Sequence, residues 1–365
     1  MIRILASSSP GEVRVAVLCE SVLTEYALWR PGCPDGLGDI HLARIETTVP
    51  AMAGAFAAIG GATGFLPDSD GAAGRAEGSL LCVRIVRTAQ GGKGPRLSEV
   101  PADAGDLPLA GLPRLLRRAP GPLHRLAAAY PDAAIVVDDA ALLATLRPSM
   151  AGRLSLAAAA FDDALADEVE ALSSPFAALP GGLRASIVPT PALTAIDVDG
   201  GSSTAAAGEK SRMQMTANRA AILALVRQIT LRSLSGAIVI DFAGIPARRR
   251  AALAPDLKAA LAADRARPRL LGFSHLGFAE ILRPRGAAPL HEQLAGPHAA
   301  GLAALRAVAA NPSARPVLRA APAVVAALQA DTAALPDLAR RLVHPLVLRS
   351  DPSLPAQSWM IEDQA

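Results

Sequence analysis

Two short apolar runs decide the fold of this chain, Leu193-Thr194-Ala195-Ile196-Asp197-Val198-Asp199 and Gly236-Ala237-Ile238-Val239-Ile240-Asp241. Each run is rich in β-branched residues and ends in aspartate, which is typical of a buried strand that stops at a polar edge. A helical pattern over residues 218–231 separates them. Strand, helix and strand in this order predict a sheet with a packed crossover helix, and therefore a mixed α/β protein.

The aspartates at the ends of these runs are the main candidates for chemistry. The carboxyl ends of strands in an α/β sheet line the functional crevice, so Asp197 and Asp241 are expected to lie there. Asp199 follows Asp197 by two residues and shares its face if the strand continues. Neighbouring carboxylates repel each other unless a cation lies between them, and such oxygen donors suit Mg²⁺ or Mn²⁺. The alternative is that these aspartates only cap turns or helices.

The residues before this region divide into two further parts. Residues 1–30 read as three short strands, and residues 30–39 form a Pro/Gly-rich boundary. Between residues 39 and 98, short strand-like segments alternate with glycines, which predicts a small barrel. Residues 154–172 show helical periodicity, and residues 320–361 read as helix, helix and strand.

Phe56, Phe65 and Lys93 suggest that the barrel binds nucleic acid. Only seven phenylalanines occur in the chain, and two of them fall in the predicted barrel. Exposed aromatic rings on such a barrel stack on bases, while a nearby lysine contacts the phosphate backbone. The alternative is that both rings pack in the barrel core.

Composition sets limits on the class of protein. The 365 residues are 51% hydrophobic, which excludes a disordered chain, and the net charge of +3 with a pI near 9.0 permits a nucleic-acid partner. The three cysteines, Cys19, Cys33 and Cys82, form no CxxC pair, so no zinc site is expected. No uncharged apolar run reaches about 20 residues, so no membrane span is expected. An odd cysteine count without a leader favours a cytoplasmic location.

The order of these segments resembles the ribonuclease E/G family. Residues 38–67 are similar to that family's OB-fold RNA-binding domain, and residues 193–201 to its catalytic "T-x-IDVNSG" strand. Residues 227–242 are similar to its "RQLRLRDLGGIIVIDF" motif, and Asp264-Arg265-Ala266-Arg267 matches its "DRAR". The tail, residues 322–362, is similar to the family's small C-terminal domain.

The resemblance implies a division of the chain into four parts. Residues 1–37 and 105–185 would form an RNase H-like subdomain, and residues 38–104 an OB-fold barrel inserted into it. Residues 186–285 would form a deoxyribonuclease-I-like catalytic subdomain. Residues 286–365 would supply a linker and a small C-terminal αβ domain.

The resemblance also implies a function, a metal-dependent endoribonuclease that cuts single-stranded RNA and leaves a 5′-phosphate and a 3′-hydroxyl. Asp197 and Asp241 would hold Mg²⁺, or Mn²⁺, and Asp199 would complete the catalytic set. RNA would bind to four residues, Phe56, Phe65, Lys93 and Arg267. Of these, Arg267 would contact the 5′ phosphate of the substrate.

The chain departs from the family pattern in three places. Asp199 stands where the family has asparagine. The zinc-binding cysteine motif is absent after Arg285, so no zinc-linked dimer is expected and any oligomer would use another interface. The segment between Ser98 and about Ala134 is too short for a complete 5′-phosphate sensor, and Val86-Arg87-Thr88-Ala89 falls in a barrel strand rather than in such a sensor. These departures leave open a second hypothesis, an RNA-binding protein of the same fold with weak or no catalysis, and a third, an unrelated structural α/β protein.

Overall fold

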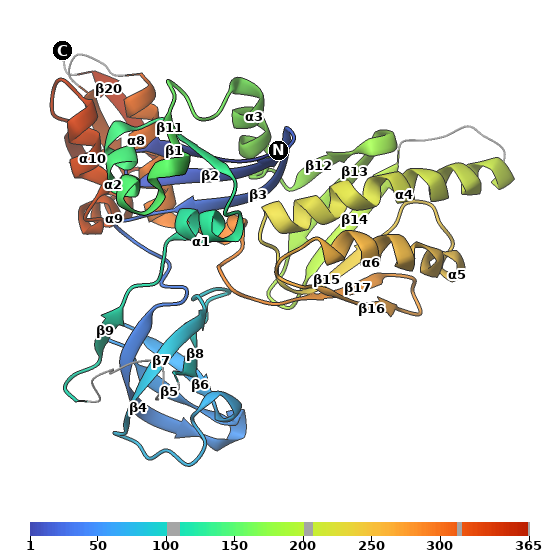
Figure 1. Cartoon of the computed structure of the whole chain (residues 1–365), viewed down its shortest axis with the longest axis horizontal. Coiled ribbons are helices and arrows are strands. Elements are labelled where there is room, and N and C mark those ends of the chain that lie inside the picture. Colours follow the sequence, from blue (N-terminus) through green and yellow to red (C-terminus); the bar gives the residue numbers. More distant parts are fainter. Residues whose placement is uncertain (101–109, 201–206, 312–315, 364–365) are drawn as a thin grey trace.

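The computed structural model describes residues 1–100, 110–200, 207–311 and 316–363. Within these residues the strands form four sheets, and the chain is a mixed α/β protein (Figure 1). The first and last parts of the chain pack together, the barrel projects from them, and the sheet that carries the two aspartate-tipped strands lies to the side.

The N-terminal sheet has the order β11-β10-β1-β2-β3, with three antiparallel strands continued by two parallel ones. Its strands are β1 (Ile2–Ser9), β2 (Glu12–Cys19), β3 (Val22–Trp29), β10 (Ala134–Val137) and β11 (Leu154–Leu156). Helices α1 (Pro122–Ala129) and α2 (Ala140–Met150) share one core with the sheet, and α3 (Asp163–Ala171) belongs to another. The helix expected over residues 154–172 is wrong in its first half. Leu154–Leu156 pairs with β10, and α3 begins only where Asp162 accepts a hydrogen bond from Leu165 N.

The second sheet closes into a five-stranded OB-like barrel. Its strands are β4 (Ile40–Val49), β5 (Gly54–Ala58), β6 (Thr63–Pro67), β7 (Leu80–Arg87) and β8 (Arg96–Glu99). They follow the order β5-β6-β8-β7-β4, and β4 pairs again with β5 to close the ring. A further strand, β9 (Arg114–Arg117), pairs with β4 beyond residue 104, where the barrel was predicted to end. Residue 104 itself lies outside the described residues, and the four-part division of the chain stays a prediction.

The third sheet has the order β12-β13-β14-β15-β17-β16. Its strands are β12 (Phe176–Leu179), β13 (Leu183–Pro189), β14 (Thr194–Gly200), β15 (Gly236–Asp241), β16 (Arg269–Phe273) and β17 (Ala279–Arg283). Helices α4 (Ala207–Leu231) and α6 (Ala254–Ala262) cover one face and bury its alternate residues, while the short helix α5 (Ala247–Arg250) follows β15. Every second residue of β14 is therefore left on the uncovered face.

The C-terminal part contains a small three-stranded sheet, ordered β19-β18-β20. Its elements are α7 (Leu290–Gln293), α8 (Gly296–Ala310), β18 (Pro316–Ala320), α9 (Pro322–Ala330), α10 (Ala334–Arg341), β19 (Val347–Ser350) and β20 (Trp359–Asp363). The expected helix, helix and strand are present, but β18 and β20 add two strands that the pattern did not indicate. This part docks on the N-terminal sheet, where Arg306 pairs with the buried Glu12.

Candidate active site and nucleic-acid interface

Asp197 and Asp241 lie directly opposite each other in the third sheet. Strands β14 and β15 are parallel, and their register pairs Ile196 with Ile240 and Asp197 with Asp241. Because both isoleucines are buried under the helices, both aspartates emerge on the uncovered face. The two strands therefore bring together carboxylates that are 44 residues apart in sequence, as the strand pattern predicted.

Asp199 lies on the same face, and an arginine lies opposite it on the neighbouring strand. It is exposed, and the buried Val198 separates it from Asp197. On the antiparallel neighbour β13, Arg184 stands opposite Asp199. The Arg184 guanidinium lies over the ring of Phe176, 4.7 Å from its centroid. The carboxylate at position 199 thus lies across from a positive charge, which offsets part of its repulsion of an anion.

Arg250, which the sequence analysis did not single out, contacts the site directly. Its Nη1 forms an ion pair with Asp241 Oδ1, and its Nε donates to Ile245 O at 2.7 Å. The run Arg248-Arg249-Arg250 was the available signal, because three consecutive arginines shortly after an aspartate-tipped strand place positive charge at that edge.

Helix α4 and a glycine fix the end of β15. Asn218 is fully buried, and its Nδ2 donates to Gln214 O at 2.7 Å and to Ala243 O at 3.0 Å. Gly244 has a φ of +60°, and a Cβ at that position would lie 2.1 Å from the Gln214 side chain. The turn after Asp241 is therefore held against α4 by contacts that a larger residue at position 244 would break.

The carboxylates fit a divalent cation held by two ligands, but not a dense carboxylate cluster. Asp241 Oδ1 is buried, and it is paired with the Arg250 guanidinium. The two neighbouring carboxylates still suit Mg²⁺, which is often held by one or two carboxylates and otherwise by water and phosphate, if Arg250 turns away from Asp241. Among the described residues, no group of three His, Cys, Asp or Glu side chains is close enough to enclose a metal ion. The pocket around these residues has a volume of about 300 Å³.

Phe56 and Phe65 form an exposed aromatic pair on the barrel. They are cross-strand partners on β5 and β6, and their rings meet edge to face with centroids 5.5 Å apart. Phe56 is 36% exposed and Phe65 is half-buried, and neither belongs to the buried barrel core. The face made by the second and third strands is the one that OB-folds use for oligonucleotides. Core packing does not account for these two rings.

Lys93 lies between the barrel and the third sheet. It sits in the loop that joins β7 to β8, where it pairs with Gln90. This loop and the start of β14 line the same cavity of about 460 Å³, with Lys93 on one side and Thr194 on the other. The barrel residue that was predicted to contact RNA therefore lines the same cavity as the start of the strand that carries Asp197.

Arg267 is exposed, as a residue that meets substrate would be. Its φ of +53° belongs to the tight turn after α6. Within the same DRAR stretch, Asp264 is buried and binds Arg283 through both carboxylate oxygens, at 2.6 and 3.2 Å. Asp264 thus has a structural role, while Arg267 projects into a cavity of about 340 Å³ that Arg269 and Arg285 also line.

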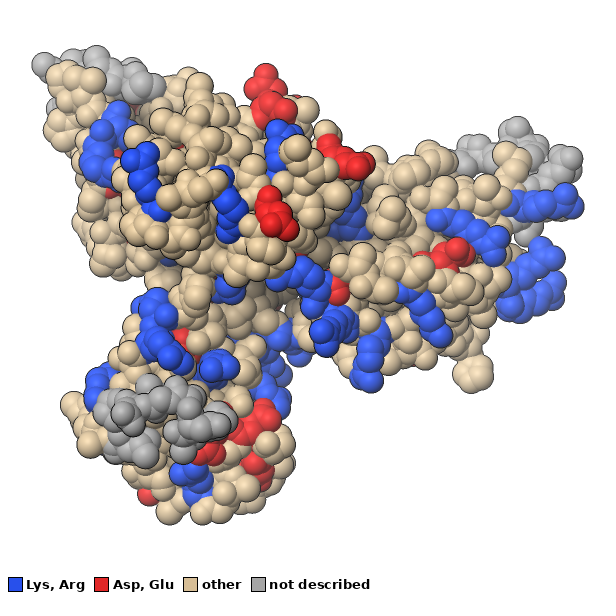
Figure 2. All heavy atoms as spheres, in the orientation of Figure 1, with Lys and Arg blue, Asp and Glu red and all other residues tan. Residues whose placement is uncertain are grey.

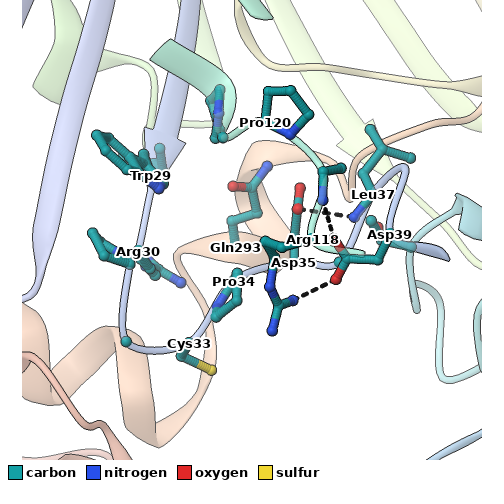
Figure 3. Close-up of a pocket in the computed structure, with 18 of the residues that line it drawn as sticks. Trp29, Arg30, Cys33, Pro34, Asp35, Leu37, Asp39, Arg118, Pro120 and Gln293 are labelled. Carbon is teal, nitrogen blue, oxygen red and sulfur yellow. Dashed lines mark hydrogen bonds and ion pairs between the residues drawn. The ribbon is translucent and has the colours of Figure 1, made fainter. Parts of the chain in front are cut away.

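A larger cavity of about 830 Å³ is lined by other residues, some of which Figure 3 shows. It opens beside the linker between the N-terminal sheet and the barrel, and its cations are engaged by carboxylates. Arg30 pairs with the buried Glu12, and Arg118 pairs with the buried Asp39, which also accepts from Ala119 N at 2.7 Å. These pairs tie the linker down, and the cavity carries none of the predicted site residues.

The fold and this face define a multi-part α/β protein in which an OB-like barrel stands beside a sheet that bears two juxtaposed carboxylates. Residues 136–286 match the model of the "Ribonuclease E/G family". This part of the chain is therefore similar to the ribonuclease E/G family. The matched residues include Asp197, Asp241 and Arg267, but not the barrel residues Phe56, Phe65 and Lys93.

Similar curated proteins carry the name ribonuclease E. The chain is 38% identical over 115 residues to ribonuclease E of Nostoc sp., which covers 31% of this chain and 17% of that protein. It is 35% identical over 120 residues to the Synechocystis sp. protein, covering 33% and 18%. It is 37% identical over 108 residues to the Escherichia coli protein, covering 29% and 10%. The matched segment thus spans less than a fifth of each relative. Among the described residues, no helix is both long enough and apolar enough to cross a membrane.

Proposed function

We propose that this protein is a metal-dependent endoribonuclease that hydrolyses phosphodiester bonds in single-stranded RNA. The observation that carries the proposal is the direct pairing of Asp197 with Asp241 on the uncovered face of the third sheet. The names of the relatives, all ribonuclease E, support the same reaction class. The products would be a 5′-phosphate and a 3′-hydroxyl.

Asp197 and Asp241 would hold Mg²⁺, with Mn²⁺ as the other candidate. When bound, such an ion supplies a more acidic water and neutralises charge on the scissile phosphate. Asp199 lies on the same face and would accept a proton or orient water there. Arg250 would turn from Asp241 toward the substrate phosphate, because its guanidinium is already at the edge of the pocket.

Single-stranded RNA fits the barrel better than a duplex does. Phe56 and Phe65 present ring surface on which unpaired bases stack, and a base inside a duplex cannot reach such rings. Lys93 would hold the backbone where the strand leaves the barrel for the third sheet. The separation of ring surface and carboxylates means that one RNA strand would have to span both parts.

The test is cleavage of a labelled single-stranded RNA in the presence of Mg²⁺, with EDTA as the metal-free arm. We expect Asp197→Asn and Asp241→Asn to lose cleavage by at least about a hundredfold, since each removes one charge from a two-carboxylate site. Asp132→Asn, an exposed aspartate in the loop after α1, is the matched control. Equal rates for wild type and Asp241→Asn would sink the catalytic assignment.

A second function is favoured by one specific observation, the ion pair between Arg250 and Asp241. A guanidinium on that carboxylate competes with a cation for the same oxygen. If the pair persists with RNA bound, the protein would be an RNA-binding protein with weak or no catalysis. RNA affinity would then survive Asp197→Ala, and no cleavage would depend on metal. Arg250→Gln separates the two functions. If the ion pair persists in wild type and blocks the metal, the variant frees Asp241 and should bind metal more tightly than wild type does.

A further inference from the structure

The cavity of about 460 Å³ at the seam between the barrel and the third sheet has a basic lining drawn from both parts. Arg87, at the end of β7, and Lys93 come from the barrel, and Arg285 comes from the segment that follows β17. Ser235, just before β15, and Thr194, at the start of β14, form the wall on the sheet side. None of these residues except Lys93 has a role in the function proposed above.

Backbone hydrogen bonds hold the two arginines side by side. Thr88, next to Arg87, donates its N–H to the carbonyl of Gly286, next to Arg285, at 3.0 Å. The Gln90 side chain donates to the same carbonyl at 3.2 Å. Arg285 packs onto the start of β15, where a Cβ on Gly236 would lie 2.5 Å from its Nη2. The fold thus forces together two like charges that would otherwise separate.

No carboxylate forms an ion pair with either arginine within the part of the chain that the structure describes. The carboxylate that lines the cavity, Glu292, accepts from Gly91 N at 2.8 Å. Burial and the nearby Arg285 and Arg96 lower the pKa of Arg87 below its ordinary value. An anion in the cavity would relieve this repulsion.

Two buried polar atoms of the residues that line the cavity have no hydrogen-bond partner. These atoms are Arg87 Nε and Ser235 Oγ. Buried polar groups are nearly always hydrogen-bonded, so two orphans at one cavity point to a missing ligand with acceptor oxygens. Ser235 stands where the family motif quoted above has glycine, so its hydroxyl is an addition of this chain.

We propose that this cavity is a phosphate subsite that binds an internal phosphodiester of the RNA, with Arg87, Arg285 and Ser235 as its donors. The proposal rests on the proposed function and assigns the path that the RNA takes from the barrel to the carboxylates. Thr194 precedes Asp197 by three residues, about 10 Å along an extended strand. The subsite therefore lies a short stretch of strand away from the scissile bond.

The basic lining continues beyond this cavity, which favours an internal phosphodiester over a chain end. Arg285 also lines the adjacent cavity of about 340 Å³, together with Arg267 and Arg269. In Figure 2, Lys and Arg side chains gather in the notch between the barrel and the β15–β17–β16 part of the sheet. The cavity is therefore not an isolated pocket, because arginines continue beyond it.

The test measures binding without cleavage, by fluorescence anisotropy of a labelled single-stranded RNA in EDTA over a range of salt concentrations. We expect Arg87→Gln and Arg285→Gln each to weaken binding about tenfold, and the slope of log affinity against log salt to shrink by about 0.7 for the phosphate that is lost. Ser235→Gly should weaken binding by a smaller factor. Arg147→Gln, an exposed arginine on α2, removes the same charge elsewhere and should leave both quantities unchanged.

A set of RNAs, each with one neutral methylphosphonate, locates the contact. At one internal linkage, the substitution should weaken binding to wild type but not to Arg285→Gln, as expected when RNA and protein changes remove the same contact. Circular dichroism melts verify that each variant is folded. A 5′-monophosphate should not change the effect of Arg285→Gln.

The outcomes separate this proposal from the proposed function. If the arginine variants bind and cleave like wild type while Asp241→Asn does not cleave, the subsite is wrong and the nuclease assignment stands. If the arginine effect appears only with 5′-monophosphorylated RNA, the cavity binds a chain end and the internal assignment is overturned. If wild type binds no RNA at all, the proposed function itself has failed.

Discussion

Two groups of arginines in this molecule differ in what faces them. Arg283 is buried against Asp264, and Arg30 and Arg118 face the buried Glu12 and Asp39. Arg285, only two residues beyond Arg283, is exposed and forms no ion pair among the described residues, and Arg87 beside it is equally unpaired there. The first group is used to hold the chain together. The second is held in place by backbone hydrogen bonds, so its charge remains available for an anion.

The largest effect expected from this comparison is on stability, at the paired arginine. Asp264 and Arg283 have side-chain exposures of 3% and 10%, and Arg283 also donates to Leu234 O at 3.0 Å. Asp264→Ala leaves a buried, unpaired guanidinium, so we expect the free energy of unfolding to fall by about 3–5 kcal/mol. Urea denaturation followed by circular dichroism measures it. A loss below about 1 kcal/mol would contradict the structural role of this pair.

The next effect is on RNA binding, at the barrel end of the proposed path. Phe56→Ala and Phe65→Ala each remove a stacking surface, which costs about 1–3 kcal/mol of binding free energy per base. Because Phe56 is exposed, its removal should leave the melting temperature of the protein nearly unchanged. Anisotropy titration with single-stranded RNA measures the first quantity and a thermal melt the second. Unchanged RNA affinity in the double variant would favour the unrelated structural protein.

A smaller effect is expected on the pH dependence of stability, and it comes from His124. This residue lines the cavity of about 830 Å³, together with Arg30 and Arg118. His124 packs edge to face on Trp29, with centroids 5.7 Å apart, and burial lowers its pKa below the ordinary value of 6.5. The folded protein therefore binds this proton less readily than the unfolded chain does. Stability should be fully present above about pH 6.5 and should fall as the pH drops below it. In His124→Gln, urea denaturation at about pH 7.5 and about pH 5.5 should show a smaller difference than in wild type.

The smallest effect on the free energy of unfolding is expected at Arg285, which forms no ion pair among the described residues. Arg285→Gln removes a repulsive neighbour of Arg87 and breaks no ion pair, so the free energy of unfolding should change by no more than about 0.5 kcal/mol. The same variant is the one expected to weaken RNA binding. If it destabilises the protein as much as Asp264→Ala does, the distinction between the two groups of arginines fails.

Local patterns predicted much of the fold and part of the site. Strand β3 and the pairing of Asp197 with Asp241 follow from alternating apolar residues, because this alternation sets both strand position and side-chain direction. The pattern failed at residues 154–172, since three residues that fit a helix formed an edge strand in a sheet built from distant segments. It also missed Arg250, because only the tertiary turn after β15 brings this residue to Asp241. The seam of Arg87 and Arg285 joins residues nearly 200 positions apart and leaves no local signal.

The register of β14 on β15 carries a consequence for how mutations would act. A slip of one residue would turn Asp241 toward α4 and α6 and expose the isoleucines at 238 and 240. The free energy gained by burying these isoleucines fixes the strand register, and the register sets the spacing of the two carboxylates. Conservative changes under the helices, such as Ile240→Val, are expected to weaken this register and to shift the carboxylates in a protein that still melts as a folded one. The geometry of the site thus depends on buried residues that do not contact the substrate.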